Sequence, residues 1–322
     1  PPPPRGWVHV RIAAAALNRL DLFVAGGIPG GAPELPHIVG SDGAGTVVAV
    51  GEGVTTARPG DEVMFDPGIS CGDCDACRAG DEPFCRAYRI LGEHVHGTVA
   101  ELVALPADNL APRPRGWSWA EAAAFSLATL TAWRMLVTRA RLTRGETVLV
   151  WGAGGGVAQA AIRIAAHLGA RVIATSSSPE KLALARELGA ELALDHRAQD
   201  VVAEVKAATG RRGCQVVVDS VGHATWERSL RVLARGGRLV SCGATSGPEA
   251  ALDLRRLFWH QWSLLGSTMG TRAEYRAVAA LAAEGLLRPH VDSVVPLARA
   301  PEAFHRLAEG RQAGKLVIEV TP

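Results

Sequence analysis

The chain has 322 residues, of which 48% are hydrophobic and 20% charged, a composition typical of a soluble globular enzyme. Its 34 basic and 32 acidic residues are interspersed and leave a formal net charge of +2, which excludes a strongly basic surface for nucleic acid or an anionic membrane. No apolar run reaches membrane-spanning length, and no signal-peptide pattern opens the chain. We therefore expect a cytoplasmic protein with one large or two ordinary domains.

The first hundred residues predict short β-strands joined by turns rich in Gly and Pro. Residues 7–16 alternate as a half-buried strand does. Residues 38–50 carry small side chains and then an apolar run, which predicts a bent strand in a compact β-barrel. The tail, from about residue 289, returns to short elements, with strands at 292–296 and 315–320 and a helix at 301–309.

The middle of the chain changes to a helical and then an alternating pattern. Ser118 and Glu121 have capping-box spacing and predict one long helix, rich in Ala and Leu, up to about Leu142. After Gly145, six apolar runs alternate with five helical patterns, which predicts a doubly wound parallel sheet. The expected strands are 147–151, 171–175, 192–195, 216–220, 239–242 and 263–267, and the expected helices are 157–168, 180–188, 200–208, 224–233 and 272–284.

A glycine-rich turn follows the first of these strands. The strand ends at Trp151, Gly152–Gly156 form the turn, and an apolar helix pattern begins at Val157. This order is typical of a dinucleotide-binding unit, in which pyrophosphate lies against backbone N–H groups at the helix N-terminus. We expect Gly154, Gly155, Gly156 and Val157 to offer these groups. The alternative is a glycine turn that simply ends a buried strand.

Four of the six cysteines are crowded between residues 71 and 85. Cys71, Cys74, Cys77 and Cys85 have the spacing C-x2-C-x2-C-x7-C, and four thiolates complete a tetrahedral zinc shell without leaving an open position. The sequence therefore predicts one structural zinc. An iron–sulfur cluster, disulfides or free thiols are the alternatives.

Several segments together resemble the medium-chain dehydrogenase/reductase superfamily, which includes zinc alcohol dehydrogenases and quinone oxidoreductases. The matching segments are 35–45, 59–63, the cysteine-rich lobe, 130–133, the glycine turn, 218–222 and 314–315. The resemblance implies an α/β protein with a GroES-like β-barrel catalytic domain at 1–112 and 289–322, and a Rossmann dinucleotide-binding domain at 113–288. The resemblance also implies that the family's usual first strands would lie before Pro1.

The resemblance also shows where this chain departs from a zinc alcohol dehydrogenase. That enzyme holds its catalytic zinc with two Cys and one His. The corresponding positions here carry Asn18, Ser41 and Leu127. The pattern Asn18-x-x-Asp21 instead resembles zinc-independent quinone oxidoreductases and enoyl reductases. It implies hydride transfer to a quinone or α,β-unsaturated carbonyl, with Asn18 polarising the substrate oxygen and Thr131 orienting nicotinamide or substrate.

The same resemblance suggests which coenzyme is used. Where an NAD enzyme carries an acid at the end of the second Rossmann strand, this chain has Ser176, followed a turn later by Lys181. A hydroxyl and an ammonium group suit a 2′-phosphate, so we expect NADP(H) in preference to NAD(H). His196 adds to this pocket if it faces the ribose, whereas the plain alternative is a serine loop that caps the next helix. At later strand ends, Gly222, Gly243 and Ser267 are expected near the nicotinamide ribose and carboxamide.

Two other functions stay open. His37, His94 and His96 are candidates for an unusual second metal site, which would favour an alcohol dehydrogenase. A non-enzymatic NADPH-binding protein on the same fold is the other alternative. The expected partners are a small-molecule substrate and a second copy of the chain, paired through the edge strand 264–267.

Overall fold

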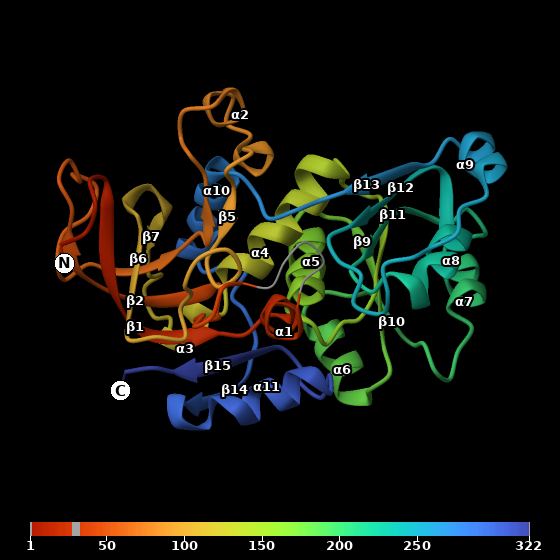
Figure 1. Ribbon diagram of the computed structural model, residues 1–322. Helices are drawn as coiled ribbons and strands as arrows, with labels where there is room; N and C mark the ends of the chain where they lie inside the picture. Colours follow the sequence, from red (N-terminus) through yellow and green to blue (C-terminus); the bar gives the residue numbers. More distant parts are fainter. Residues whose placement is uncertain (1, 28–32, 322) are drawn as a thin grey trace. The chain divides into compact units, whose positions relative to one another are not determined.

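The computed structural model describes residues 2–27 and 33–321 and divides into two compact units (Figure 1). The first unit combines Pro1–Leu130 with Met269–Pro322, and the second is Thr131–Thr268. The predicted domain borders, 112/113 and 288/289, differ from these limits because two intervening segments bond to each other within the first unit. Ser126 Oγ and Tyr275 Oη lie 3.1 Å apart, and Arg288 Nε donates to Glu121 Oε1 at 2.7 Å.

A seven-stranded sheet forms the centre of the first unit. Its order is β14-β15-β1-β2-β3-β7, and β6 also pairs with β1. Every second residue at the start of β1, Val8, Val10 and Ile12, is fully buried in the core of this sheet. Among the described residues, no pairing joins the end strands β14 and β7. The strands are β1 (Trp7–Ala16), β2 (Asp42–Val50), β3 (Glu62–Phe65), β6 (Leu102–Pro106), β7 (Leu110–Pro112), β14 (Val291–Pro296) and β15 (Lys315–Glu319).

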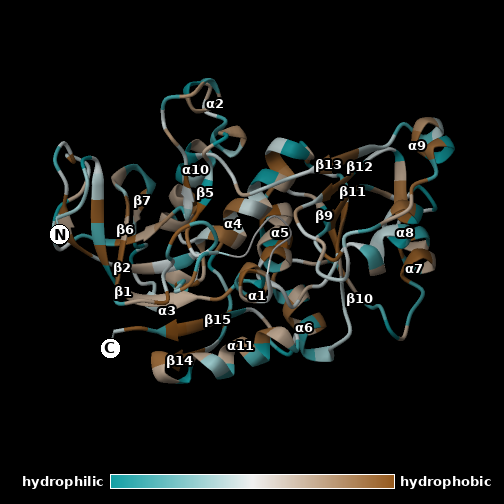
Figure 2. Ribbon diagram, in the orientation of Figure 1, coloured by the Kyte–Doolittle hydropathy of each residue, from teal (hydrophilic) through white to brown (hydrophobic). Residues whose placement is uncertain are grey.

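Helices and a small two-stranded sheet complete this unit. The small sheet pairs β4 (Gly68–Ile69) with β5 (Arg89–Ile90). Strand β15 is mainly hydrophobic (Figure 2), as expected for a strand between two neighbours. The helices are α1 (Arg19–Gly26), α2 (Asp75–Arg78), η1 (Glu82–Phe84), η2 (Ala107–Asn109), α3 (Trp119–Ala123), α10 (Arg272–Ala283), η4 (Leu297–Arg299) and α11 (Ala300–Ala308).

The second unit is built on a six-stranded parallel sheet with the order β10-β9-β8-β11-β12-β13. This arrangement confirms the predicted doubly wound sheet. The strands are β8 (Thr147–Val150), β9 (Arg171–Ser176), β10 (Leu192–Asp195), β11 (Cys214–Asp219), β12 (Leu233–Ser241) and β13 (Ser263–Gly266). The helices between them are α5 (Gly156–His167), α6 (Pro179–Glu187), α7 (Val201–Ala208), α8 (His223–Val232) and α9 (Leu254–His260), of which α9 was not predicted.

The single long helix predicted from Ser118 to Leu142 is wrong. The chain forms α3, then α4 (Ser126–Trp133), then a π-helix at Arg134–Arg139. The predicted capping box is present, since Glu121 N donates to Ser118 Oγ and Ser118 N donates to Glu121 Oε2. The break arises because Leu127 N donates to Asp42 Oδ1 at 2.7 Å, so a distant carboxylate takes a backbone donor at the start of α4.

Within the described part of the chain, no helix combines the length and the apolarity that a membrane crossing requires.

Candidate functional site

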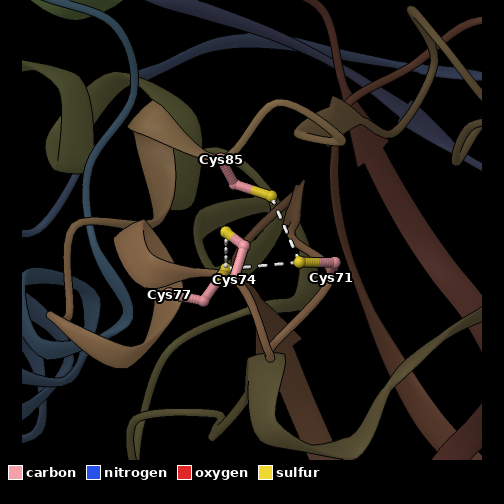
Figure 3. A group of neighbouring side chains, drawn as sticks. All are labelled: Cys71, Cys74, Cys77 and Cys85. Carbon is pink, nitrogen blue, oxygen red and sulfur yellow. Dashed lines mark hydrogen bonds between the residues drawn. The ribbon is translucent and has the colours of Figure 1, made fainter.

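The four clustered cysteines converge in space, as their spacing predicts (Figure 3). Cys74 is the N-cap of α2, Cys77 lies in α2, Cys85 follows η1, and Cys71 precedes them in a loop. Their Sγ atoms all lie within 4.8 Å of one another, with 3.5 Å between Cys74 and Cys77 and 3.5 Å between Cys85 and Cys71. All four are free thiols, so the lobe is not closed by disulfides.

This arrangement fits a zinc ion. Zinc bound by four thiolates at about 2.3 Å places neighbouring sulfur atoms about 3.8 Å apart. The separations of 3.5, 3.5 and 3.8 Å between neighbouring sulfur atoms here agree with that distance. Because protein would supply all four ligands, such a zinc would hold the loop and would not bind substrate.

The histidines proposed as a second metal site do not form one. In the described residues, the cysteine cluster is the only group of three or more His, Cys, Asp or Glu side chains close enough to share a metal ion. Two of the imidazole rings instead accept hydrogen bonds from backbone N–H groups. His96 Nδ1 accepts from Ile38 N at 3.3 Å, and His94 Nδ1 accepts from Ile90 N at 3.2 Å. His37 Nε2 lies 3.0 Å from Gly92 O. These histidines organise loops.

The glycine turn of the second unit leaves a helix N-terminus open to a ligand. Gly155 is the N-cap of the 12-residue helix α5, and it has no side chain to bond the first N–H groups. Two bonds fix the turn, from Gly155 N to Gly152 O at 3.0 Å and from Ala153 N to Thr175 O at 2.8 Å. Gly156 and Val157 begin the helix. A pyrophosphate is the expected ligand of such an uncapped N-terminus.

Three predicted adenosine-pocket residues lie beside this turn. Ser176 ends β9 and is buried, and His196 follows β10, where its N–H donates to Ser176 O at 3.0 Å. Lys181 extends across the turn, because a Cβ added at Gly154 would lie 2.6 Å from its Cδ. Glycine at this position thus gives room to the lysine side chain. The helix-capping alternative is also present, since Ser178 Oγ accepts from Lys181 N at 3.5 Å.

Arg228 is a further cation near this pocket that the sequence reasoning missed. Its guanidinium carbon lies 4.9 Å from the centre of the Trp151 ring, and the His196 ring centre lies 6.4 Å from the same indole. Burial lowers the pKa of His196, and the charge of Arg228 lowers it further. The only sequence signal was Trp151, which lies between strand β8 and the glycine turn.

The other predicted coenzyme residues follow later strands of the same sheet. Gly222 follows β11, Gly243 follows β12 and Ser267 follows β13, so all three lie at the carboxyl edge of the parallel sheet. Gly222 has a φ of 87°, and its N–H donates to Asp219 Oδ1 at 3.0 Å, so this N–H is already engaged. Ser267 Oγ is buried without a hydrogen-bond partner among the described residues, which leaves it available to a polar ligand.

In the first unit, two of the three positions that carry catalytic zinc ligands in the resemblance bond to one carboxylate, and the third is its neighbour in the chain. Asp42 is fully buried and follows Ser41. Its Oδ2 accepts from Asn18 Nδ2 at 2.9 Å, and its Oδ1 accepts from Leu127 N at 2.7 Å. The Ser41 hydroxyl is buried and has no partner among the described residues. The three positions therefore lie around Asp42, and their side chains are an amide, a hydroxyl and an isobutyl group.

A buried lysine completes this cluster. Lys315, the first residue of β15, is 4% exposed; its Nζ donates to Asp42 Oδ2 at 2.8 Å and to Asn18 Oδ1 at 2.6 Å. Sequence reasoning noted Lys315 within a matching segment but gave it no role. The signal available was a lysine directly before the apolar run Leu316–Ile318, whereas lysines in most proteins are exposed.

Asp21 fixes the backbone on both sides of the cluster. Its Oδ2 accepts from Asn18 N at 2.7 Å and its Oδ1 accepts from Gly40 N at 2.9 Å. Burial raises the pKa of Asp21 to about 6, although these two bonds and Lys315 lower it. Thr131, the other predicted catalytic residue, is buried in α4.

Comparison with known proteins identifies the family. An alcohol dehydrogenase GroES-like domain model matches residues 4–115, and a zinc-binding dehydrogenase model matches residues 156–284. A quinone oxidoreductase of Pseudomonas aeruginosa is 35% identical over 97% of this chain and 90% of its own length. An acryloyl-coenzyme A reductase of Metallosphaera sedula is 30% identical over 99% of this chain and 93% of its own length.

The chain belongs to the medium-chain dehydrogenase/reductase superfamily. A solved structure of an NAD-dependent alcohol dehydrogenase has the same fold, with a TM-score of 0.96, 45% identity and coverage of 100% of this chain and 94% of that one. Like other members of this NAD(P)-dependent superfamily, the chain is an oxidoreductase with a GroES-like domain and a Rossmann domain. Its cysteine lobe agrees with the zinc-binding character of the family.

Proposed function

We propose that this enzyme transfers hydride from NADPH to a quinone or an α,β-unsaturated carbonyl compound without a catalytic zinc. The observation that carries this proposal is the cluster around Asp42. Asn18, Ser41 and Leu127 offer none of the thiolate or imidazole ligands that catalytic zinc prefers, and an ammonium group bonds the Asp42 carboxylate instead. Hydrogen bonds must then stabilise the negative charge that develops on the substrate oxygen.

The second unit supplies the residues proposed to hold the coenzyme, which provides the hydride when it is bound. In this proposal the N–H groups of Gly154, Gly156 and Val157 are aimed at the pyrophosphate, whereas the N–H of Gly155 already bonds Gly152 O at 3.0 Å and shapes the turn. Ser176, Lys181 and His196 are assigned to the adenosine ribose and its 2′-phosphate, with Arg228 as a nearby positive charge. Gly222, Gly243 and Ser267 are assigned to the nicotinamide end.

The first unit supplies the proposed substrate-polarising group. Asn18 Nδ2 carries two protons. One bonds Asp42 at 2.9 Å, and the other makes a long 3.4 Å bond to Ala16 O. The longer bond is the weaker one. We therefore expect this N–H to donate a hydrogen bond to the substrate carbonyl oxygen in place of Ala16 O. We propose that Thr131 orients the nicotinamide or the substrate.

The test of this function is a paired measurement of metal content and activity. Protein purified without added zinc is expected to hold about one zinc per chain and to reduce enones and quinones with NADPH. About two zinc ions per chain, together with alcohol oxidation, would overturn the zinc-free mechanism. NADPH binding without turnover of any enone, quinone or alcohol would favour the binding protein.

Alcohol oxidation remains the second candidate. The observation in its favour is the 45% identity to a solved NAD-dependent alcohol dehydrogenase. It predicts oxidation of simple alcohols with NAD⁺, whereas the favoured function predicts little activity on saturated ketones, which gain most from a Lewis acid.

We predict that Ser176→Asp reverses the coenzyme preference. A carboxylate at this buried strand end would repel a 2′-phosphate and accept from the free ribose hydroxyls of NADH. The ratio of kcat/KM for NADPH to that for NADH is expected to fall by about 100-fold or more. Lys206→Ala on α7 is the control and leaves this ratio unchanged. An unchanged ratio in Ser176→Asp would place the adenosine ribose elsewhere.

We also propose a cytoplasmic homodimer. Six free cysteines suit a reducing compartment, and cell fractionation tests the location. Within the described residues, β13 pairs with β12 alone, and α9 exposes Phe258 at 68% and Trp259 at 65%. Pairing of the β13 strands of two chains would cover the free edge of β13 and the exposed aromatic side chains of α9.

Light scattering is expected to give twice the 33.7 kDa chain mass. Phe258→Glu should shift the protein toward monomer, because it places a charge in the covered surface. Phe84→Glu, at a phenylalanine of the cysteine lobe that is 63% exposed, is the matched control and should stay dimeric. A monomeric wild-type protein would refute this arrangement.

A further inference from the structure

Lys315 is an unusual residue in this chain. The sequence has 34 cationic side chains, but only three are lysines, at positions 181, 206 and 315. Lys315 is 4% exposed, and its ammonium group reaches Asn18 and Asp42 from a strand that lies 297 residues later than Asn18 in sequence. A buried cation is costly unless it is paired, and here it has a carboxylate and an amide oxygen as partners.

The two partners fix which way the Asn18 amide faces. An ammonium group can only donate, so the amide must present Oδ1 to Lys315, at 2.6 Å. An ionised carboxylate can only accept, so the amide must present Nδ2 to Asp42, at 2.9 Å. Because the two charges act on opposite ends of the amide, a flipped amide would lose both bonds. The orientation of Asn18 thus follows from charge.

We propose that Lys315 is a positioning residue for the reaction, which orients and polarises the Asn18 amide so that its weakly held N–H faces the substrate carbonyl oxygen. This inference rests on the proposed function. A hydrogen bond from the ammonium group to Oδ1 withdraws electron density from the amide and strengthens its N–H as a donor. Hydride addition to the β-carbon places negative charge on the carbonyl oxygen, and this N–H stabilises it until a solvent proton completes the reduction.

The charges around Asn18 agree with such a role. Asp42 balances Lys315 through their 2.8 Å contact, so the ammonium group remains in place without a bound substrate. Asp21 holds the backbone N–H of Asn18, not its side chain, so it fixes the residue without competing for the amide protons. Lys315 therefore differs in one testable respect from a lysine that only forms a structural ion pair. It also donates a hydrogen bond to the Asn18 amide, which is the proposed donor to the substrate oxygen.

The experiment compares Lys315→Met, Lys315→Arg and Lys206→Met in full-length enzyme. The substrates are NADPH and a series of ring-substituted 4-phenylbut-3-en-2-ones. For Lys315→Met we expect kcat to fall by about 100-fold, the loss typical for one oxyanion-stabilising donor, with the KM for NADPH unchanged. Lys315→Arg should recover part of this loss, and Lys206→Met, at a half-buried lysine of α7, should match the wild type.

A second readout separates polarisation from a merely structural role. If Lys315 strengthens the donor to the developing oxyanion, its removal should make kcat more sensitive to electron-withdrawing ring substituents. A structural role lowers the rate on all substrates by the same factor. Equal sensitivity in wild type and Lys315→Met, or a wild-type rate in Lys315→Met, would overturn the inference.

Folding and the underlying function are controlled separately. Lys315→Met leaves Asp42 buried without its cation, so the double variant Asp42→Asn/Lys315→Met, which removes both charges, is tested in parallel for folding by circular dichroism. Both variants must show the slow rate and the steeper substituent dependence for the inference to stand. Failure of the wild-type enzyme to reduce any enone or quinone would refute the proposed function instead.

Discussion

Removal of zinc from the cysteine lobe is expected to lower the melting temperature by roughly 8–16 °C. The reason is mass action: a ligand present at 1,000 times its dissociation constant stabilises the folded state by about 4 kcal/mol. For a domain of this size each kcal/mol shifts the midpoint by about 2–4 °C. Little secondary structure stabilises the lobe besides the metal, since its helices α2 and η1 have only four and three residues.

The substitution Cys85→Ser should reproduce the effect of a chelator. Cys85 is 6% exposed, and its Sγ lies 3.5 Å from that of Cys71, so its loss opens the tetrahedron. Elemental analysis should give less than one zinc per chain, and thermal unfolding should match the chelated wild type. Cys242→Ala, outside the cluster, is the control with a full zinc content. A zinc content and melting temperature like those of the wild type in Cys85→Ser would show that this thiol is not a ligand.

The stability of the enzyme is expected to fall as the pH rises from 5 to 8, chiefly because of Asp66. This carboxyl group is 2% exposed, and burial raises its pKa from 3.8 to about 7. The Gly68 N–H, at 2.8 Å, and the charge of Arg272 lower the pKa, whereas Glu82 and Asp42 raise it. An acid with a raised folded-state pKa releases its proton more readily when unfolded, so ionisation favours unfolding.

The size of this effect follows from the shift. A rise of about three pKa units corresponds to about 4 kcal/mol of unfolding free energy. The folded protein loses this amount of stability above pH 7 and loses none of it below pH 4. Asp66→Asn keeps an acceptor for Gly68 N–H and removes the charge. At pH 8 it is therefore expected to be more stable than the wild type by up to about 4 kcal/mol, and near pH 5 the gain should be much smaller.

Denaturant unfolding at several pH values measures how the free energy of unfolding depends on pH in the wild type and in Asp66→Asn. Asp21, whose pKa burial raises to about 6, contributes in the same direction and stays in both proteins. Glu121, with a pKa lowered to about 2 by its bond to Arg288, titrates below this range. Parallel stability curves for the two proteins between pH 5 and 8 would show that Asp66 does not titrate there.

Local patterns in the sequence were enough to predict the parallel sheet and the cysteine lobe. Each strand of the second unit is a short apolar run, and the glycine turn and the cysteine spacing lie within a few residues. The start of β12 was missed, because Gly236 and Gly237 interrupt its apolar pattern. Helix α9 was missed because its exposed aromatic residues break the usual amphipathic pattern.

Contacts between distant residues could not be predicted in this way. Nothing near Leu127 indicates that Asp42, 85 positions earlier, would take its N–H and divide the predicted long helix. Lys315 lies in a hydrophobic strand, and its partners are set by the pairing of β15 with β1. The three departures from the zinc-ligand pattern were visible in the sequence, but the charge network at these positions emerged only from the fold.

The pairing of β1 with β15 also bears on how the enzyme is synthesised. The second unit is one continuous stretch, Thr131–Thr268, so all its strands leave the ribosome before β15 is translated. At about 5–20 residues per second, the 297 positions between Asn18 and Lys315 correspond to roughly 15–60 s of elongation. During that time the nascent β1 has no β15 partner, and Asp42 has no ammonium counterion. The growing polypeptide thus leaves the Ala14–Ala16 edge of β1 unpaired, and the Lys315–Asn18 contact forms only after β15 is made.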